Sequence, residues 1–236
     1  MNTHLTKIAV SCALFLTSGS VLAAAEDDPL LFMFKADQLE VRDADEDTVT
    51  GWEAFAWIGK DLNKFWFKTE GERTDDETEG TEYQFLYSRA IDPNWDIQFG
   101  IKHDAYPKPT RDWGAIGFYG VAPYFFEVDS ALFFNDDGQI NLRLEAEYEI
   151  MLTQKWVLSP EVEINLFGKD DDELGIGSGF SNLEAGLRLR YEITRQVAPY
   201  IGINHEQLLG DTADIAEDAG GETSESTAVA GVRFWF

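Results

Sequence analysis

The sequence predicts an all-β protein, a transmembrane antiparallel up-and-down β-barrel of about 12 strands, preceded by a cleaved signal peptide. Three observations support this fold class. Segments of strand character, each about ten residues long, alternate apolar and polar side chains. After residue 24, no segment approaches the run of about 18 apolar residues that a membrane-spanning helix needs. The chain also ends on an alternating aromatic segment whose last residue is Phe236.

The N-terminal residues have the anatomy of an export signal. Lys7 supplies a positive charge, residues 8–16 form a short apolar stretch, and residues 21–23 end in a small-residue cleavage pattern. We therefore expect a signal peptide at 1–24, a short acidic segment with the first strand at 25–50, and the remainder of the barrel at 51–236. Lipidation at Cys12 is the less favoured alternative, because it would leave half of the apolar stretch on the mature chain. The mature chain has no other cysteine, which excludes disulfides and thiolate metal sites.

The composition is acidic and rich in aromatic residues. The formal net charge is −26, and aromatic residues make up 14% of the chain. The negative charge opposes nucleic-acid binding and attracts cations, so no nucleic-acid partner is expected. The aromatic side chains suit the girdles at the two membrane interfaces of a barrel, and they argue against a disordered acidic protein.

Turn and loop residues divide the chain into segments of strand character, and no helical period of useful length interrupts them. The predicted strands are 30–42, 51–60, 64–73, 80–91, 94–104, 112–122, 124–134, 139–152, 154–168, 181–194, 197–207 and 225–236. An even count fits a bacterial barrel with both termini in the periplasm. Short connections such as 61–63 and 194–196 are then periplasmic turns, and long acidic ones such as 169–179 and 210–223 are extracellular loops.

The alternation assigns each residue to one face of the sheet, most clearly in the C-terminal half. Even-numbered residues from 142 to 152 are apolar, whereas Arg143 and the glutamates at 145, 147 and 149 occupy odd positions. At the end of the chain, Phe234 and Phe236 alternate with Arg233. A water-soluble β-sandwich would place the same charges outside. The strand length and the terminal phenylalanine favour a barrel with lipid outside and charges in the lumen.

Several stretches of the chain resemble the copper resistance protein B family of outer-membrane proteins. They are the segments 64–72 (KFWFKTEGE), 87–91 (YSRAI), 95–100 (WDIQFG), 120–128 (GVAPYFFEV), 143–148 (RLEAEY), 153–154 (TQ), 186–192 (GLRLRYE) and 198–202 (APYIG). The resemblance runs from about residue 50 to the C-terminus. It implies an outer-membrane barrel that handles copper, either by letting the ion cross or by binding it.

One departure from the family concerns the region before the barrel. Members commonly carry a stretch rich in methionine and histidine there. In this chain, residues 25–50 contain Met33 and no histidine, and they are acidic instead. Thioethers suit Cu(I) and imidazoles suit Cu(II), so this segment lacks most of the recognisable copper-collecting side chains.

The candidate metal ligands are few. His103 and His205 each end a strand beside a carboxylate, Asp104 and Glu206, near the expected extracellular rim. Met151 extends the lumen-facing glutamate row and is the candidate soft ligand inside the barrel. A loose copper site at the mouth would need the loops to bring the two histidine strands together. The alternative is a pair of solvated rim histidines and a gap-filling methionine, because one imidazole beside one acid is not a metal signature.

A row of ionisable side chains is expected to face the lumen. It comprises Glu70, Glu72, Glu145, Glu147, Glu149, Glu184, Arg188, Arg190 and Glu192. Charges at bilayer depth are tolerated where they face protein or water and find partners. These side chains form either a structural network that plugs a narrow barrel or a cation path whose carboxylates release the ion, and the two roles are compatible.

These observations predict an outer-membrane protein of a Gram-negative bacterium that is not an enzyme. No serine has the context of a nucleophile with a histidine base, and the carboxylates are too numerous to mark a hydrolase pair. The expected function is copper handling, with a copper ion bound or transported; the alternative is a narrow structural or general porin without a metal role. The expected partners are outer-membrane lipid and lipopolysaccharide, the barrel-insertion machinery acting on Phe236, and a periplasmic copper protein.

Overall fold

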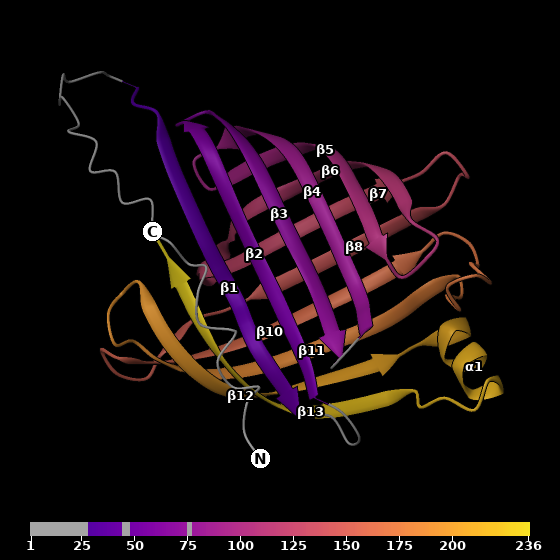
Figure 1. Ribbon diagram of the computed structural model, residues 1–236. Coiled ribbons are helices and arrows are strands. Elements are labelled where there is room, and N and C mark those ends of the chain that lie inside the picture. The colour runs from indigo at the N-terminus through magenta and orange to yellow at the C-terminus, as the bar shows by residue number, and fades with distance from the viewer. Residues whose placement is uncertain (1–27, 44–47, 75–76) are drawn as a thin grey trace, which may run out of the picture.

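The computed structural model describes residues 28–43, 48–74 and 77–236, and their strands close into one antiparallel barrel (Figure 1). The elements are β1 (Leu31–Asp43), β2 (Thr48–Lys60), β3 (Asn63–Thr74), β4 (Glu77–Asp92), β5 (Trp95–Tyr106), β6 (Arg111–Ala122), the 3₁₀ turn η1 (Pro123–Phe125), β7 (Phe126–Phe134), β8 (Ile140–Glu147), β9 (Ile150–Met151), β10 (Trp156–Phe167), β11 (Gly179–Tyr191), β12 (Val197–Leu208), α1 (Gly210–Asp218) and β13 (Ser224–Trp235). The expected signal peptide at 1–24 lies outside the described residues.

The strands pair in sequence order, and the last one returns to the first. β9 continues the position of β8, since both pair with β10, so the wall has twelve strand positions as predicted. β13 pairs with β1 from Lys35↔Trp235 to Asp43↔Ala228. The backbone of Phe34 exchanges two hydrogen bonds with that of Phe236, at 2.9 and 3.0 Å. Closure leaves no unpaired sheet edge.

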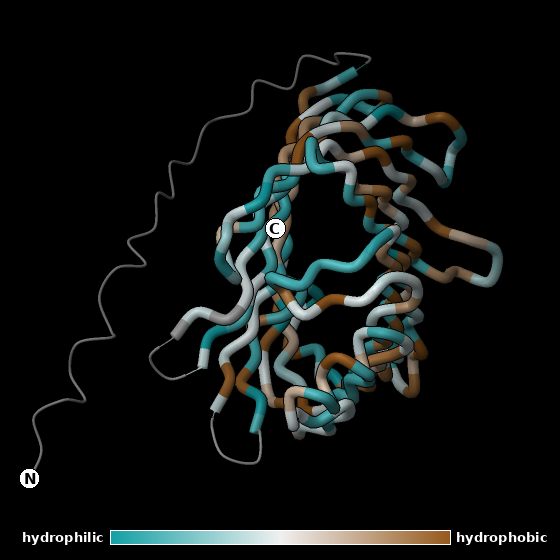
Figure 2. Tube along the Cα trace, turned by 90° about the vertical axis from the view of Figure 1, so that its right-hand side faces the viewer, coloured by the Kyte–Doolittle hydropathy of each residue, from teal (hydrophilic) through white to brown (hydrophobic). Residues whose placement is uncertain are grey.

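The two ends of the barrel differ in their connections. Short turns and both ends of the described chain lie at one end, which we call the turn end (Figure 1). The longer connections and α1 lie at the opposite end, which we call the loop end and which faces the viewer in Figure 2. This division matches the predicted alternation of short turns and long loops. Placing the turn end in the periplasm remains a prediction.

One predicted strand, 139–152, is interrupted. The structure splits it into β8 and β9, with Tyr148 and Glu149 between them. The N–H of Tyr148 donates to the carbonyl of Pro160 at 3.0 Å, but Pro160 has no N–H to return the bond. The ladder between neighbouring strands therefore breaks beside the proline.

A short helix was not expected from the sequence. α1 forms in the long acidic connection between β12 and β13, where a loop was predicted. Its Thr212 is buried, donates to the hydroxyl of Ser181 at 3.0 Å and accepts from the N–H of Gly177 at 2.9 Å. Nine residues are too few for a stable isolated helix, so these tertiary contacts hold it in place. Within the described residues, no helix is long and apolar enough to span a membrane.

The structure confirms the predicted apolar outer face and polar inner face of the barrel wall. Apolar side chains such as Phe65, Phe85 and Ile201 are exposed on the outside of the sheet. Polar and charged side chains such as Lys102 and Arg188 are buried on the inside. At the C-terminus, the rings of Phe234 and Phe236 pack at a tilt against Phe34 on the outer face, while Arg233 points into the lumen and forms an ion pair with Asp37. The barrel is therefore apolar outside and ionic inside, as in a membrane protein.

Candidate functional site

The two histidines lie on opposite walls of the barrel. His103 is on β5 and His205 on β12, strands that stand half the circumference apart. The Nδ1 of His103 lies 2.7 Å from a carboxylate oxygen of the exposed Asp112, and the Nδ1 of His205 lies 2.8 Å from the hydroxyl of Ser226. The structure therefore does not bring these two imidazoles together.

The acidic neighbours of the histidines point the other way. Asp104 faces the lumen, where it accepts from the indole N–H of Trp113 at 2.6 Å and pairs with Lys102 at 3.1 Å. Glu206 also has the inward phase and accepts from Asn182 at 3.4 Å. Each histidine and the acid that follows it are thus separated by the sheet itself, because successive side chains of a strand point to opposite faces.

The candidate soft ligand sits at the turn end. Met151 in β9 pairs with Val157 and is 55% exposed. It lies at the opposite end of the barrel from both histidines, whose strands place them near the loop end. Across the described residues, no three His, Cys, Asp or Glu side chains converge closely enough to hold a metal ion.

The predicted lumen charges do face the lumen, and most are paired. Their partners, with N···O distances, are Arg143 for Glu70 (3.0 Å), Arg42 for Glu72 (2.5 Å) and Glu184 (3.5 Å), Arg233 for Glu147 (3.0 Å), Arg190 for Glu149 (2.5 Å), Glu40 for Arg188 (3.0 Å) and Arg195 for Glu192 (3.3 Å). Apart from Glu192, whose partner is three residues along the chain, these paired charges find their partners on other strands, as their cost in a membrane requires.

The most buried ionic group is Glu40, which the sequence reasoning missed. Glu40 is 2% exposed and accepts from Arg188, Arg42 and the hydroxyl of Tyr200. We call these four residues the Glu40 cluster. A β-bulge between Ala36 and Glu40 interrupts the alternation of β1, and that local irregularity hid its phase.

Side chains divide the lumen into cavities. At the turn end lies an open vestibule of about 590 Å³. The central cavity is far smaller, about 70 Å³, and an outer cavity of about 50 Å³ adjoins it, with Glu53, Glu70 and Glu145 lining both. Four residues line both the vestibule and the central cavity and therefore lie between them, namely Phe55, Trp66, Tyr119 and Glu127. We call the three aromatic ones the aromatic constriction.

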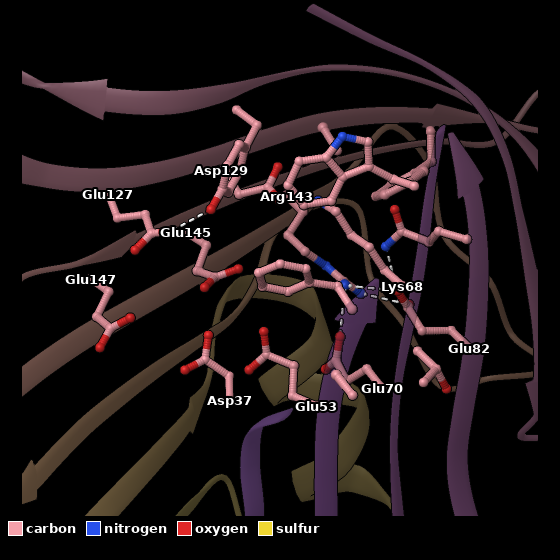
Figure 3. A pocket seen from close by; sticks show the side chains of 18 residues that line it. Asp37, Glu53, Lys68, Glu70, Glu82, Glu127, Asp129, Arg143, Glu145 and Glu147 are labelled. Carbon is pink, nitrogen blue, oxygen red and sulfur yellow. Dashed lines mark hydrogen bonds and ion pairs between the residues drawn. The ribbon is translucent and has the colours of Figure 1, made fainter. Parts of the chain in front are cut away.

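The wall of the central cavity is strongly acidic (Figure 3). Eight carboxylates line it, namely Asp37, Glu53, Glu70, Glu82, Glu127, Asp129, Glu145 and Glu147, against two cationic side chains, Lys68 and Arg143. Lys68 pairs with Asp129, and Arg143 spans Glu70 and Glu82 at 3.0 and 2.9 Å. The alternation of β2 could also have predicted that Glu53 faces the lumen, because it lies two and four residues before Phe55 and Trp57, which line the vestibule.

The connection between β10 and β11 reaches over part of the loop end. Its Asp171 pairs with Arg111 of β6 at 2.8 Å, although β6 is three positions away from β10 around the barrel. Further along the same loop, the N–H of Ser178 donates to Asp170 at 2.7 Å. Hydrogen bonds from the hydroxyl and N–H of Ser178 hold the pKa of Asp170 below its usual range. Solvated acidic residues are thus tied into a defined loop.

Comparisons with known proteins place the chain in a family. A family model described as copper resistance protein B precursor matches residues 30–236. The chain belongs to this family. Copper resistance protein B of Escherichia coli is 40% identical over 213 residues, covering 90% of this chain and 72% of that protein. A copper resistance protein B homolog of Pseudomonas syringae pv. tomato is 40% identical over 210 residues, covering 89% of this chain and 71% of that protein. This is a family of copper-resistance barrels and not of enzymes.

Solved outer-membrane porins share the fold. The NanC porin superposes with a TM-score of 0.56 at 14% identity, covering 86% of this chain and 99% of that chain. The KdgM porin gives a TM-score of 0.51 at 12% identity, covering 87% and 98% of the two chains. The member of the copper resistance protein B family described here is therefore an outer-membrane β-barrel, as the alternation of its strands predicted.

Proposed function

We propose that this barrel handles copper by admitting the ion into its lumen and letting it cross or reside within the outer membrane. The family and the names of its curated relatives point to copper. The observation that carries the proposal is the central cavity, where eight carboxylates surround a space of about 70 Å³. Carboxylate-lined constrictions favour cations and reject anions.

The size of the cavities argues against passage of larger solutes. A cavity of this kind needs about 10–15 Å³ to hold one water molecule, so the central and outer cavities, at about 70 and 50 Å³, hold an ion with several water molecules and are far smaller than the vestibule. The aromatic constriction of Phe55, Trp66 and Tyr119 separates this region from the wide vestibule. A vestibule that is open at the turn end and narrows inward suits delivery of a small ion to, or its collection from, that side.

The alternative function is a narrow porin with no metal role. The vestibule of about 590 Å³ favours it, because an open mouth of that size admits small solutes generally. Opening of the constriction would be needed for such solutes to pass. The porin-like fold carries no weight here, because a fold hosts many functions.

We further propose that His103, His205 and Met151 act as separate, weak copper contacts at the two mouths. The pairing of His103 with Asp112 at 2.7 Å supports a contact at the loop end, and the exposure of Met151 supports one at the turn end. Lipopolysaccharide would surround the loop end, and a periplasmic copper protein would meet the turn end. The outward Phe236 would be the end that the barrel-insertion machinery reads.

Transport into vesicles tests the proposal against the alternative. Purified protein is placed in lipid vesicles that enclose a copper-sensitive dye, and uptake of Cu²⁺ is compared with swelling in neutral sugars. We expect copper uptake well above that of protein-free vesicles and no swelling. Swelling in sugars, with copper uptake no faster than that of a porin without a metal role, would replace the copper function with the porin.

A further inference from the structure

Two carboxylates in the middle of the lumen have no partner. Within the described part of the chain, Glu53 of β2 and Glu145 of β8 accept no hydrogen bond and form no ion pair. Both line the central cavity (Figure 3), and both also line the adjoining outer cavity. β2 and β8 stand on opposite walls, so the two side chains approach each other across the lumen.

Trp66 is a second residue of the central cavity that carries an unsatisfied polar group. Its side chain is 5% exposed and lines the same central cavity. Its indole N–H is buried and has no acceptor among the described residues. Buried polar groups are normally hydrogen-bonded, so Trp66 adds an unsatisfied donor to a cavity wall that already holds two carboxylates without a protein partner. Water molecules around a bound ion satisfy the two carboxylates.

A row of carboxylates leads from the loop end of the barrel down to this pair. In the strand registers, each member lies directly opposite the next, in the order Glu225 (β13), Glu206 (β12), Glu184 (β11), Glu163 (β10) and Glu145 (β8). We call these five residues the carboxylate row. Side chains directly opposite each other have Cβ atoms about 4.5–5.5 Å apart, and like charges in these positions repel.

The protein neutralises the carboxylate row only weakly. Arg143 approaches Glu163 at 3.6 Å and Arg42 approaches Glu184 at 3.5 Å, both longer than the ion pairs these arginines make elsewhere. The row therefore retains negative charge along one wall. Mobile cations reduce the repulsion, and each step of about 5 Å between neighbours suits an ion that moves from one carboxylate to the next.

We propose that Glu53 and Glu145 bind a hydrated divalent cation that reaches them along the carboxylate row. The inference rests on the proposed copper function and specifies the form of the ion. Neither cavity is lined by His, Met or Cys, so the atoms that its acidic side chains offer to a metal ion are oxygens. Oxygen ligands suit hydrated ions and not Cu(I). The site therefore takes Cu²⁺ in competition with Mg²⁺ and Mn²⁺, and copper specificity does not arise there.

The arrangement also explains release. No three ligating side chains converge among the described residues, so the ion keeps most of its water shell and is held through it. Such a site binds weakly and exchanges fast, which a conducting path requires. A copper store would instead need a closed set of protein ligands.

Mn²⁺ binding to the full-length barrel in detergent, followed by electron paramagnetic resonance, tests the site. The double variant Glu53→Gln, Glu145→Gln is compared with the wild type and with Glu217→Gln, Glu222→Gln. The control removes the same charge from exposed positions at the loop end. We expect at least a tenfold weaker tightest Mn²⁺ site in the lumen variant and no change in the control. Cu²⁺ bound to the His103→Ala, His205→Ala variant, which lacks the two proposed imidazole contacts, should show oxygen coordination without nitrogen splitting.

Equal Mn²⁺ affinity in the lumen and control variants, or nitrogen splitting in the copper spectrum of the His103→Ala, His205→Ala variant, would overturn the inference. If gel electrophoresis shows that the lumen variant does not form a closed barrel, a competition experiment on the wild-type protein tests the site instead. The inference then requires that Mg²⁺ displaces bound Mn²⁺ and that Cu(I) does not. Failure of the copper function is distinguishable, since wild-type vesicles would then exclude copper while the Mn²⁺ site remained measurable in detergent.

Discussion

The Glu40 cluster and the Glu53–Glu145 pair both place glutamates inside the barrel, but the partners of these glutamates differ. Glu40 is sealed and accepts hydrogen bonds from two arginines and a tyrosine. Glu53 and Glu145 face a cavity and have no protein partner. The comparison indicates that a lumen carboxylate can either stabilise the wall through ion pairs or remain available to bind an ion. Which role it has depends on whether arginine or lysine side chains lie beside it.

The largest expected effect comes from removing an arginine that pairs with Glu40. Arg188→Leu leaves Glu40 buried beside fewer cations, and losing one partner of a buried ion pair costs about 3–5 kcal/mol. We expect the free energy of unfolding in lipid vesicles, measured by urea titration of tryptophan fluorescence, to fall by that amount. Arg195→Leu is the control, because Arg195 is exposed and its pair with Glu192 contributes about 0–1 kcal/mol. Similar losses in both variants would contradict the structural role of the cluster.

Removing the charge of the unpaired Glu145 should instead raise the free energy of unfolding. Glu145 lies directly opposite Asp129 and Glu163, so Glu145→Gln relieves repulsion between like charges. We expect the same urea titration in metal-free buffer to show a gain of about 0.2–1 kcal/mol. Glu217→Gln on α1 serves as the matched control with no change. A clear loss of stability in Glu145→Gln would mean that Glu145 belongs to the wall and not to the ion path.

A smaller effect concerns the histidines. His103 and His205 lie half the circumference apart and share no contact, so their contributions should be independent. We expect His103→Ala and His205→Ala each to weaken Cu²⁺ binding about twofold, and the double variant to show the product of the two. A double variant no weaker than either single one would indicate one shared site, contrary to the geometry.

The smallest effect concerns an exposed carboxylate that, unlike Glu145, has a donor. The lowered pKa of Asp170 means that its bonds to Ser178 favour the folded loop above the unfolded pKa of about 3.8, and that this contribution disappears as the pH falls through the lower folded pKa. In Ser178→Ala the backbone donor remains, so the pKa should rise part of the way toward 3.8. A carboxyl titration by nuclear magnetic resonance measures the change, and a fixed pKa would assign the whole effect to the backbone.

Much of the wall could be predicted because alternation is a local property. Twelve strand positions, the inward glutamates and the outward Phe236 all follow from a period of two. The interruption at Tyr148 could also have been read, but it required knowing that Pro160 stands opposite. Which side chains face each other across the lumen, as Glu53 and Glu145 do, depends on the number and the tilt of the strands. No local sequence pattern contains that information. The histidines were placed on the correct strand ends, and only the closed barrel revealed that they stand on opposite walls.

The bulge in β1 has a further consequence for how the barrel is completed. Because of it, Asp37, which keeps the inward phase of Lys35, and Glu40 both face the lumen, and Asp37 forms an ion pair with Arg233 of the last strand at 2.7 Å. The seam between the first and last strands is thus joined by side-chain charge as well as by backbone. The two residues lie near opposite ends of the chain, so only a closed barrel brings them together. The ion pair therefore stabilises the finished cylinder and cannot stabilise an open sheet.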